Sequence, residues 1–361
     1  MADIRFAVLS LTLGACWAGS VSAQQADAPA TIFENVRIFD GTGAGLSPPS
    51  NVLVRGNVVE TISTGPIEVG DSTRAVVVEG EGKTLMPGLI DAHAHVVLST
   101  IPIATMMTGD PNYVTLISGQ AAEDMLMRGF TSVRDLAGPT FGLKRAIDEG
   151  IVAGPRIWPS GAMISQTSGH GDYRTVHDIP QSYNQPPHFT DRLGYSAVAD
   201  GRGEVLRRVR EQLMRGASQI KLAAGGGVAS NYDPLDVSQF TEDELRAAVE
   251  AAEDWGTYVT VHAYTPDAVQ TAIRAGVKVI DHGQLLDEQT VQIMADKGIW
   301  WSMQPFLDDE DSIPFPEGSA NRAKQLEITD GTDAAYQLAK KHGVKLAWGT
   351  DTLFDPQLAT R

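Results

Sequence analysis

The sequence has one cysteine, few basic residues and no long apolar run beyond its N-terminal segment. Cys16 has no second thiol with which to form a disulfide inside the chain, so packing or bound metal must stabilise the fold. The 28 Lys and Arg residues are outnumbered by 45 Asp and Glu residues, and the net charge of −17 disfavours a nucleic-acid partner. We also expect no transmembrane span, since no later segment is long and apolar enough.

The remaining composition is that of a globular protein. Apolar residues make up 42% and charged residues 20% of the 361 residues, which is far from the composition of a disordered chain. A chain of this length folds as one large domain or two smaller ones, with a sizeable core.

Residues 1–23 have the features of an export signal peptide. Arg5 precedes an apolar run over residues 6–18, and the small residues at 21–23 are suited to cleavage before Gln24. We expect an exported protein, periplasmic or secreted. The alternative is a lipid anchor on Cys16, because residues 13–16 resemble a bacterial lipoprotein cleavage site.

Residues 31–85 predict a small N-terminal β-domain, which we interpret as sandwich-like. Apolar stretches at 32–39, 52–54, 58–62 and 75–78 are separated by turn-forming residues. No helical periodicity interrupts them, so we expect these stretches to be its strands.

From residue 86 to 361, apolar stretches alternate with helical patterns, which is typical of βαβ units around a parallel sheet. Thr241 and Glu244 form a capping box, and Thr265-Pro266 marks a second helix start. We predict an α/β fold, a (β/α)8 TIM-type barrel with its active site at the carboxyl ends of the strands. The chain ends soon after Asp351, so we expect this barrel to be C-terminally truncated. The candidate strands are 89–92, 131–134, 156–159, 219–222, 258–261, 277–280, 299–303 and 345–348.

One connection is unusually long and polar. Residues 161–203 separate the third and fourth predicted strands and contain His170, His177 and His188. Loops of this length inside a domain are usually functional lids or binding loops. The alternative is a disordered insertion.

A His-x-His pair follows the first predicted barrel strand. On a strand, residues i and i+2 face the same way, so His93 and His95 project together as two nitrogen ligands for one metal ion. His262, His282 and Asp351 end the fifth, sixth and eighth predicted strands. In a barrel these positions converge above the sheet, whereas a single histidine at a strand end is more often an ordinary polar residue.

Lys221 ends the fourth predicted strand, before three successive glycines. An ammonium group beside metal ions would be repelled. Carbamylation by CO2 would instead make the side chain an anionic oxygen ligand. The alternative is a lysine that reaches solvent or pairs with an acid.

Residues 87–95, Lys221, His262, His282 and Asp351 together resemble the amidohydrolase superfamily, in its binuclear, carbamylated-lysine subtype. The resemblance covers nearly all of the chain after the signal and implies two divalent metal ions, for which Zn²⁺ is the usual choice. By this resemblance, the ligands are His93, His95 and Asp351 for the more buried ion, His262 and His282 for the more exposed ion, and carbamylated Lys221 as the bridge.

The resemblance also implies a mechanism of amide hydrolysis by a metal-bridging hydroxide. Asp351 would accept the proton from this hydroxide and return it to the leaving amine. His170 resembles a family position that contacts the substrate carbonyl oxygen. A loop histidine in solvent is the alternative for His170.

Within the superfamily, residues 161–172 and 220–240 resemble the Xaa-Pro dipeptidase-like and ochratoxinase-like group. This group removes C-terminal amino acids from dipeptides and N-acyl amino acids, so we expect a small-molecule amide or dipeptide substrate. Tyr232 matches a position that contacts the substrate carboxylate, and Arg174 is a second candidate for that contact. The alternative for Tyr232 is an ordinary loop aromatic.

Two other functions stay open, and so does assembly into a homo-oligomer. A mononuclear imidazolonepropionase-like or deaminase-like enzyme would share the histidines and Asp351 but lack the lysine, so Lys221 argues against it. A non-catalytic barrel subunit would normally have lost ligands that are all present here.

Overall fold

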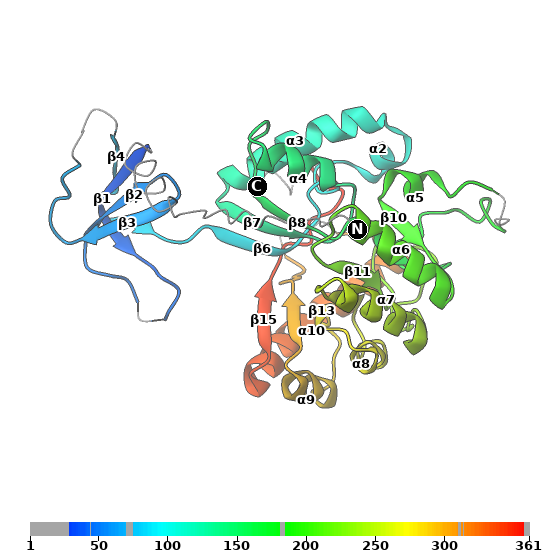
Figure 1. Cartoon of the computed structure of the whole chain (residues 1–361). Helices are drawn as coiled ribbons and strands as arrows, with labels where there is room; N and C mark the ends of the chain where they lie inside the picture. Colours follow the sequence, from blue (N-terminus) through cyan, green and yellow to red (C-terminus); the bar gives the residue numbers. More distant parts are fainter. Residues whose placement is uncertain are drawn as a thin grey trace, which may run out of the picture. The chain divides into compact units, whose positions relative to one another are not determined.

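The computed structural model describes residues 29–43, 45–69, 75–180, 185–309, 312 and 314–356. The chain divides into two compact units between Pro87 and Gly88 (Figure 1). The predicted signal peptide, with Cys16, lies outside the described residues. Within the described parts, no helix is long and apolar enough to cross a membrane.

The first unit is a β-sheet in which the predicted strands are confirmed. The strand order is β3-β2-β1-β4, with β5 also paired to β1. β2 runs antiparallel to β1 and β3, whereas β4 runs parallel to β1. A second layer, as in a sandwich, stays a prediction. The strands are β1 (Ala30–Ile38), β2 (Ser50–Arg55), β3 (Val58–Ser63), β4 (Ala75–Glu79) and β5 (Thr84–Leu85).

The second unit is an α/β fold of parallel strands, as predicted. The strands form two sheets, one in the order β6-β7-β8 and the other in the order β10-β9-β11-β12-β13-β14-β15. Every pairing in both sheets is parallel. The strands are β6 (Leu89–Ala94), β7 (Phe130–Asp135), β8 (Arg156–Pro159), β9 (Met163–Ser165), β10 (Ser196–Val198), β11 (Ile220–Ala223), β12 (Val259–Ala263), β13 (Val279–His282), β14 (Trp300–Met303) and β15 (Lys345–Trp348).

Helices connect these strands, and α6 to α9 follow one another around the outside of the strands (Figure 1). The main apolar core lies between these helices and strands β9 to β14. The helices are α2 (Ile103–Thr108), α3 (Pro111–Met127), α4 (Phe141–Asp148), α5 (Phe189–Leu193), α6 (Arg202–Met214), α7 (Glu242–Asp254), α8 (Pro266–Ala275), α9 (Glu288–Lys297) and α10 (Ala320–His342).

The predicted helix boundaries follow from local chemistry. The Thr241 hydroxyl accepts from Glu244 N at the start of α7, and the Glu244 carboxylate accepts from Thr241 N, which completes the capping box. Pro266 occupies the first position of α8, where no intrahelical N–H bond is lost. Gly276 ends the same helix with φ 103°, a conformation that a side chain would disfavour.

The long connection over residues 161–203 is not a featureless insertion in its described part. It contributes β9, α5 and β10 to the second unit. β9, and not the predicted third strand β8, pairs with β11. β8 ends at Pro159, and Gly161, with φ 73°, interrupts the extended backbone before β9 begins. Ser218 N, just before β11, donates to Pro159 O at 2.8 Å. The segment therefore extends the sheet beside the carboxyl ends of the strands.

Candidate metal centre

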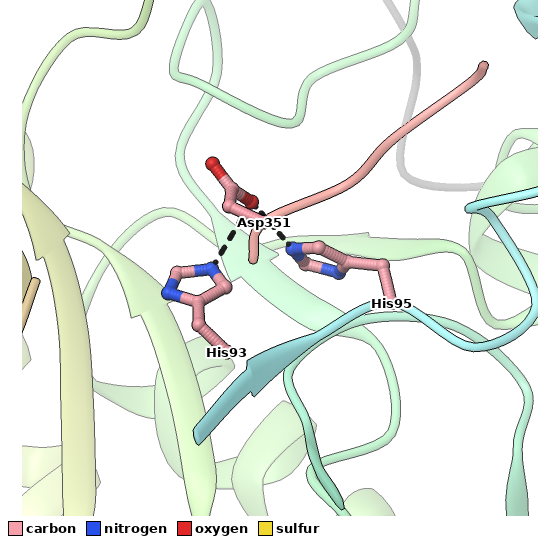
Figure 2. A group of neighbouring side chains, drawn as sticks. All are labelled: His93, His95 and Asp351. Carbon is pink, nitrogen blue, oxygen red and sulfur yellow. Dashed lines mark hydrogen bonds and ion pairs between the residues drawn. The ribbon is translucent and has the colours of Figure 1, made fainter. Parts of the chain in front are cut away.

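Three predicted ligands meet where β6 and the segment after β15 come together (Figure 2). Asp351 Oδ1 lies 3.0 Å from His95 Nε2 and 3.3 Å from His93 Nε2. One ligand atom from each of the three residues lies within 4.8 Å of the others. His93 lies on β6 and His95 follows directly after the end of this strand, and both side chains are buried.

Asp91, two residues before His93, holds the two chain segments of this cluster together. Its carboxylate accepts from His93 N at 2.9 Å, from Thr350 N at 3.1 Å and from Thr350 Oγ1 at 2.7 Å. Asp351 N donates to His93 O at 2.8 Å. Asp351 itself has φ 51°, an uncommon conformation for a residue with a side chain, which these bonds hold in place.

His262 and His282 complete a continuous group of imidazoles. The ring centroids are 4.4 Å apart for His262 and His282, and 4.8 Å apart for His282 and His93. His282 Nδ1 lies 4.0 Å from Asp351 Oδ2. The strand-end histidines of β12 and β13 therefore adjoin the first cluster.

The protonation states of this group fit a metal site. Burial lowers the pKa of His93 and lowers the pKa values of His262 and His282 well below the ordinary range, so these imidazoles are neutral. Burial opposes ionisation of Asp351, but the adjacent imidazoles of His93 and His95, which also hydrogen-bond to its carboxylate, outweigh burial and hold the pKa of Asp351 well below its usual value. Neutral imidazoles and an ionised carboxylate are the donor forms that Zn²⁺ requires.

One buried nitrogen atom that faces Asp351 lacks a hydrogen-bond partner, and a metal ion would supply one. This atom is His282 Nδ1, which lies 4.0 Å from Asp351 Oδ2 and has no hydrogen-bond partner among the described residues. Buried polar atoms are rarely left unsatisfied. The residues present therefore fit a cation bound between the strand ends.

Lys221 is buried below these ligands and pairs with Asp281. Its Nζ lies 2.6 Å from Asp281 Oδ2, while the guanidinium of Arg134 donates to Asp281 Oδ1 at 2.6 Å and Thr260 Oγ1 donates to Oδ2 at 2.7 Å. Burial lowers the pKa of Lys221 against the opposing charge of Asp281. Without carbamylation, Lys221 therefore pairs with an acid, which is one of the alternatives that the sequence left open.

His170 reaches the same group from the connection after β9. Its ring stacks on His262 with centroids 4.1 Å apart, and its Nδ1 lies 2.9 Å from Ser230 Oγ. Burial lowers the pKa of His170 to about 4, so the ring is neutral near pH 7. His170 is therefore not a loop histidine in solvent, which was the alternative.

The two candidates for carboxylate binding differ in their surroundings. Tyr232 lies in the loop after β11, with 47% of its surface exposed. Arg174 donates to both carboxylate oxygens of Asp172, at 2.8 and 2.7 Å, and to Thr167 Oγ1 at 2.9 Å. These bonds use Nε and Nη2 of the guanidinium and hold the loop around Arg174, whose contact with a substrate carboxylate stays a prediction.

Sequence reasoning missed Arg134 and Asp281. These two residues form a buried ion pair next to Lys221. A signal was present, since each is a charged residue inside a short apolar strand. It also missed Gln304, whose Nε2 lies 3.2 Å from His93 Nδ1, and Tyr264, whose ring centroid lies 4.9 Å from that of His282.

Comparison with known proteins identifies the family of this chain. The sequence profile described as "Amidohydrolase family" matches residues 84–359. The chain is 35% identical over 289 residues to ochratoxinase of Aspergillus niger, covering 74% of this chain and 58% of that protein. The chain thus spans just over half the length of this relative.

Solved structures show the same likeness. A prolidase in complex with N-methylphosphonate-L-proline has a TM-score of 0.81 and 34% identity, covering 90% of this chain and 79% of that one. A Xaa-Pro dipeptidase with bound methionine has a TM-score of 0.75 and 29% identity, covering 89% and 79%. The chain belongs to the amidohydrolase family.

Proposed function

We propose that this protein is a metal-dependent hydrolase that cleaves the amide bond before a C-terminal amino acid in a dipeptide or an N-acyl amino acid. The observation that carries the proposal is the meeting of neutral imidazoles, one ionised carboxylate and a buried lysine at the strand ends. The similarity to ochratoxinase and to prolidase structures supports an amide substrate.

We assign two divalent ions, with Zn²⁺ as the expected metal. His93, His95 and Asp351 would hold one ion, and His262 and His282 would hold the other. Lys221, carbamylated by CO2, would bridge the two, and its lowered pKa favours the neutral amine that reacts with CO2. When bound, such ions lower the pKa of a water molecule and polarise the scissile carbonyl.

The remaining chemistry belongs to side chains of this chain. Asp351 is ionised and only 15% exposed at its side chain, so its carboxylate can accept a proton and later return it to the leaving amine. His170, whose ring stacks on His262, would contact the substrate carbonyl oxygen through Nε2, since Nδ1 faces Ser230. Tyr232, half-exposed and two residues after Ser230 in the chain, would contact the substrate carboxylate.

We further infer that the two parallel sheets are parts of one barrel. Ser218 N, just before β11, donates to Pro159 O at the end of β8. Asp351 N, just after β15, donates to His93 O on β6. These two bonds join both edges of the β6-β7-β8 sheet to the larger sheet, which is the arrangement that closure requires.

The test combines metal content with hydrolysis. Elemental analysis of the purified protein should give two ions per chain, and release of amino acid should be measured from N-acyl-phenylalanine and from Xaa-Pro dipeptides. A chelator should abolish hydrolysis, and added Zn²⁺ should restore it. One ion per chain, with no hydrolysis of either substrate class, would favour the mononuclear enzyme instead.

We also propose that the protein is exported, on the basis of residues 1–23 alone. Fractionation of cells that produce the natural protein should place it outside the cytoplasm, with cleavage before Gln24. Labelling by a radioactive fatty acid, lost on Cys16→Ser, would indicate the lipid anchor.

A further inference from the structure

The loop over residues 227–233 is clamped by a lysine of α10. Lys324 Nζ donates to Gly227 O at 3.0 Å, to Ser230 O at 3.1 Å and to Asp233 O at 2.6 Å. An ammonium has three donors, so these bonds use all of its capacity. Among the described residues, no carboxylate forms an ion pair with Lys324. The ammonium of this partly buried side chain therefore binds backbone carbonyl oxygens.

Asn321, one turn earlier, contacts the same loop. Its Nδ2 donates to Val228 O at 2.6 Å, while the Ser319 hydroxyl caps the helix by accepting from Arg322 N. Consecutive turns at the start of α10 thus hold the loop that carries Ser230 and Tyr232. The loop geometry depends on a helix that holds none of the predicted metal ligands.

The hydrogen bonding of Ser230 has two competing arrangements. Its Oγ lies 2.9 Å from His170 Nδ1 and 3.2 Å from Gly227 O. The hydroxyl has a single proton to donate. If that proton goes to the Gly227 carbonyl, His170 must carry its own proton on Nδ1 to make the bond with Ser230. If the proton goes to His170 Nδ1, the imidazole carries its proton on Nε2.

The two arrangements have different chemical consequences. A neutral imidazole with the proton on Nδ1 presents a lone pair at Nε2, which repels a carbonyl oxygen. The other tautomer presents an N–H that can donate to that oxygen. Lys324 already donates to Gly227 O, so this carbonyl keeps a hydrogen-bond donor when the Ser230 hydroxyl turns away from it. The hydroxyl can then donate to His170.

We propose that Lys324 is a positioning residue that, through Gly227 and Ser230, fixes the His170 imidazole with its proton on Nε2. This inference rests on the proposed function for the role of His170, but the tautomer itself is independent of catalysis. A second set of bonds fixes the backbone of His170, since its N donates to Gln239 Oε1 at 2.9 Å and Gln239 Nε2 donates to Asp233 Oδ2 at 3.1 Å. The loop anchored by Lys324 therefore sets both the position and the tautomer of the ring.

The direct test is ¹⁵N NMR of histidine-labelled, zinc-loaded protein, in which couplings to the ring protons identify the protonated nitrogen. His170→Gln identifies the signals of His170 by their loss. We expect protonation at Nε2 in the natural sequence and a shift towards Nδ1 in Lys324→Met. Ser230→Ala, which keeps the Lys324 clamp, should also release the tautomer preference, and Lys324→Arg should largely retain it.

Kinetics provide the second readout. Lys324→Met should lower kcat at least roughly tenfold, since loss of a donor to a developing oxyanion costs about 10²–10³ in kcat when it is complete. KM should change little. Lys340→Met, on the exposed surface of the same helix, is the matched control and should change neither parameter.

Protonation of His170 at Nδ1 in the natural sequence would overturn the proposal. So would an unchanged tautomer in both Lys324→Met and Ser230→Ala. If no amide substrate is hydrolysed, the proposed function fails while the NMR result still decides the role of Lys324.

Discussion

The ammonium of Lys221 and the carboxylate of Asp281 form an ion pair of 2.6 Å in which both side chains are almost fully buried. Asp281 does not depend on Lys221 alone, because the guanidinium of Arg134 contacts its other oxygen at the same distance. Burial opposes ionisation of Asp281, but these two cations hold its pKa far below the ordinary range. If Lys221 became an anionic carbamate, Asp281 would therefore still have Arg134 as its counter-ion.

This arrangement makes a prediction for Lys221→Ala. The variant should fold, since Arg134 and Thr260 still neutralise and hold Asp281. It should lose the bridging ligand, so we expect metal content to fall from two ions per chain to one or fewer, with hydrolysis reduced at least about 10²-fold. Elemental analysis and activity on the same preparation check this. Unchanged metal content would contradict the bridging role.

Arg134→Met tests the second ion pair of Asp281, the one with Arg134. Removal of one partner from a buried ion pair costs roughly 3–5 kcal/mol, and Asp281 would retain only Lys221 as a cation. Lys221 would then be held as an ammonium, so we expect less carbamate, measured by ¹³C NMR after exposure to ¹³CO2. Urea unfolding of the metal-free protein gives the stability.

A surface arginine provides the control for that experiment. Arg145 pairs with Glu149 one turn away on α4 and is 79% exposed at its side chain. Arg145→Met should cost less than about 1 kcal/mol and leave the carbamate signal unchanged. Equal losses for both variants would mean that Arg134 has no special role below the ligands.

His170 contributes to the pH dependence of stability, because burial lowers its pKa to about 4 from the ordinary 6.5. Between these values the unfolded chain binds a proton that the His170 side chain of the folded chain does not bind. The free energy of unfolding of the metal-free protein should therefore fall as the pH drops from 6.5, and the contribution of His170, roughly 3 kcal/mol, should be complete below about pH 4. His262 and His282, whose pKa values burial also lowers, add to the loss.

Urea unfolding over this pH range measures the effect. His170→Gln should make the free energy of unfolding less dependent on pH, because one titrating group is removed. His177→Gln, at an exposed position of the same segment, is the matched control. A slope that is identical for His170→Gln and the natural sequence would mean that other buried histidines account for it.

The strand ends were predictable from sequence, whereas the pairing of the interior charges was not. Polar residues directly after apolar runs located His93, His262 and His282 to within a residue of the observed strand ends, and Asp351 follows the end of β15 by three residues, because one rule governs every parallel strand. Arg134 and Asp281 are separated by 147 residues. Neither has a local pattern that indicates its partner, so only the folded topology brings the two together.

Gly227 makes a prediction that connects the loop with the site. A Cβ atom at this position would overlap the imidazole of His170, so Gly227→Ala must displace the ring or the loop. Displacement of a reacting group by about 1 Å can cost roughly 10²-fold in rate, and we expect a loss of that order in kcat/KM. Metal content should stay at its natural value, because the loop contributes no predicted ligand. Gly203→Ala, where a Cβ meets nothing within 4 Å, should leave activity intact. Full activity in Gly227→Ala would show that the position of His170 over Gly227 is not needed for hydrolysis.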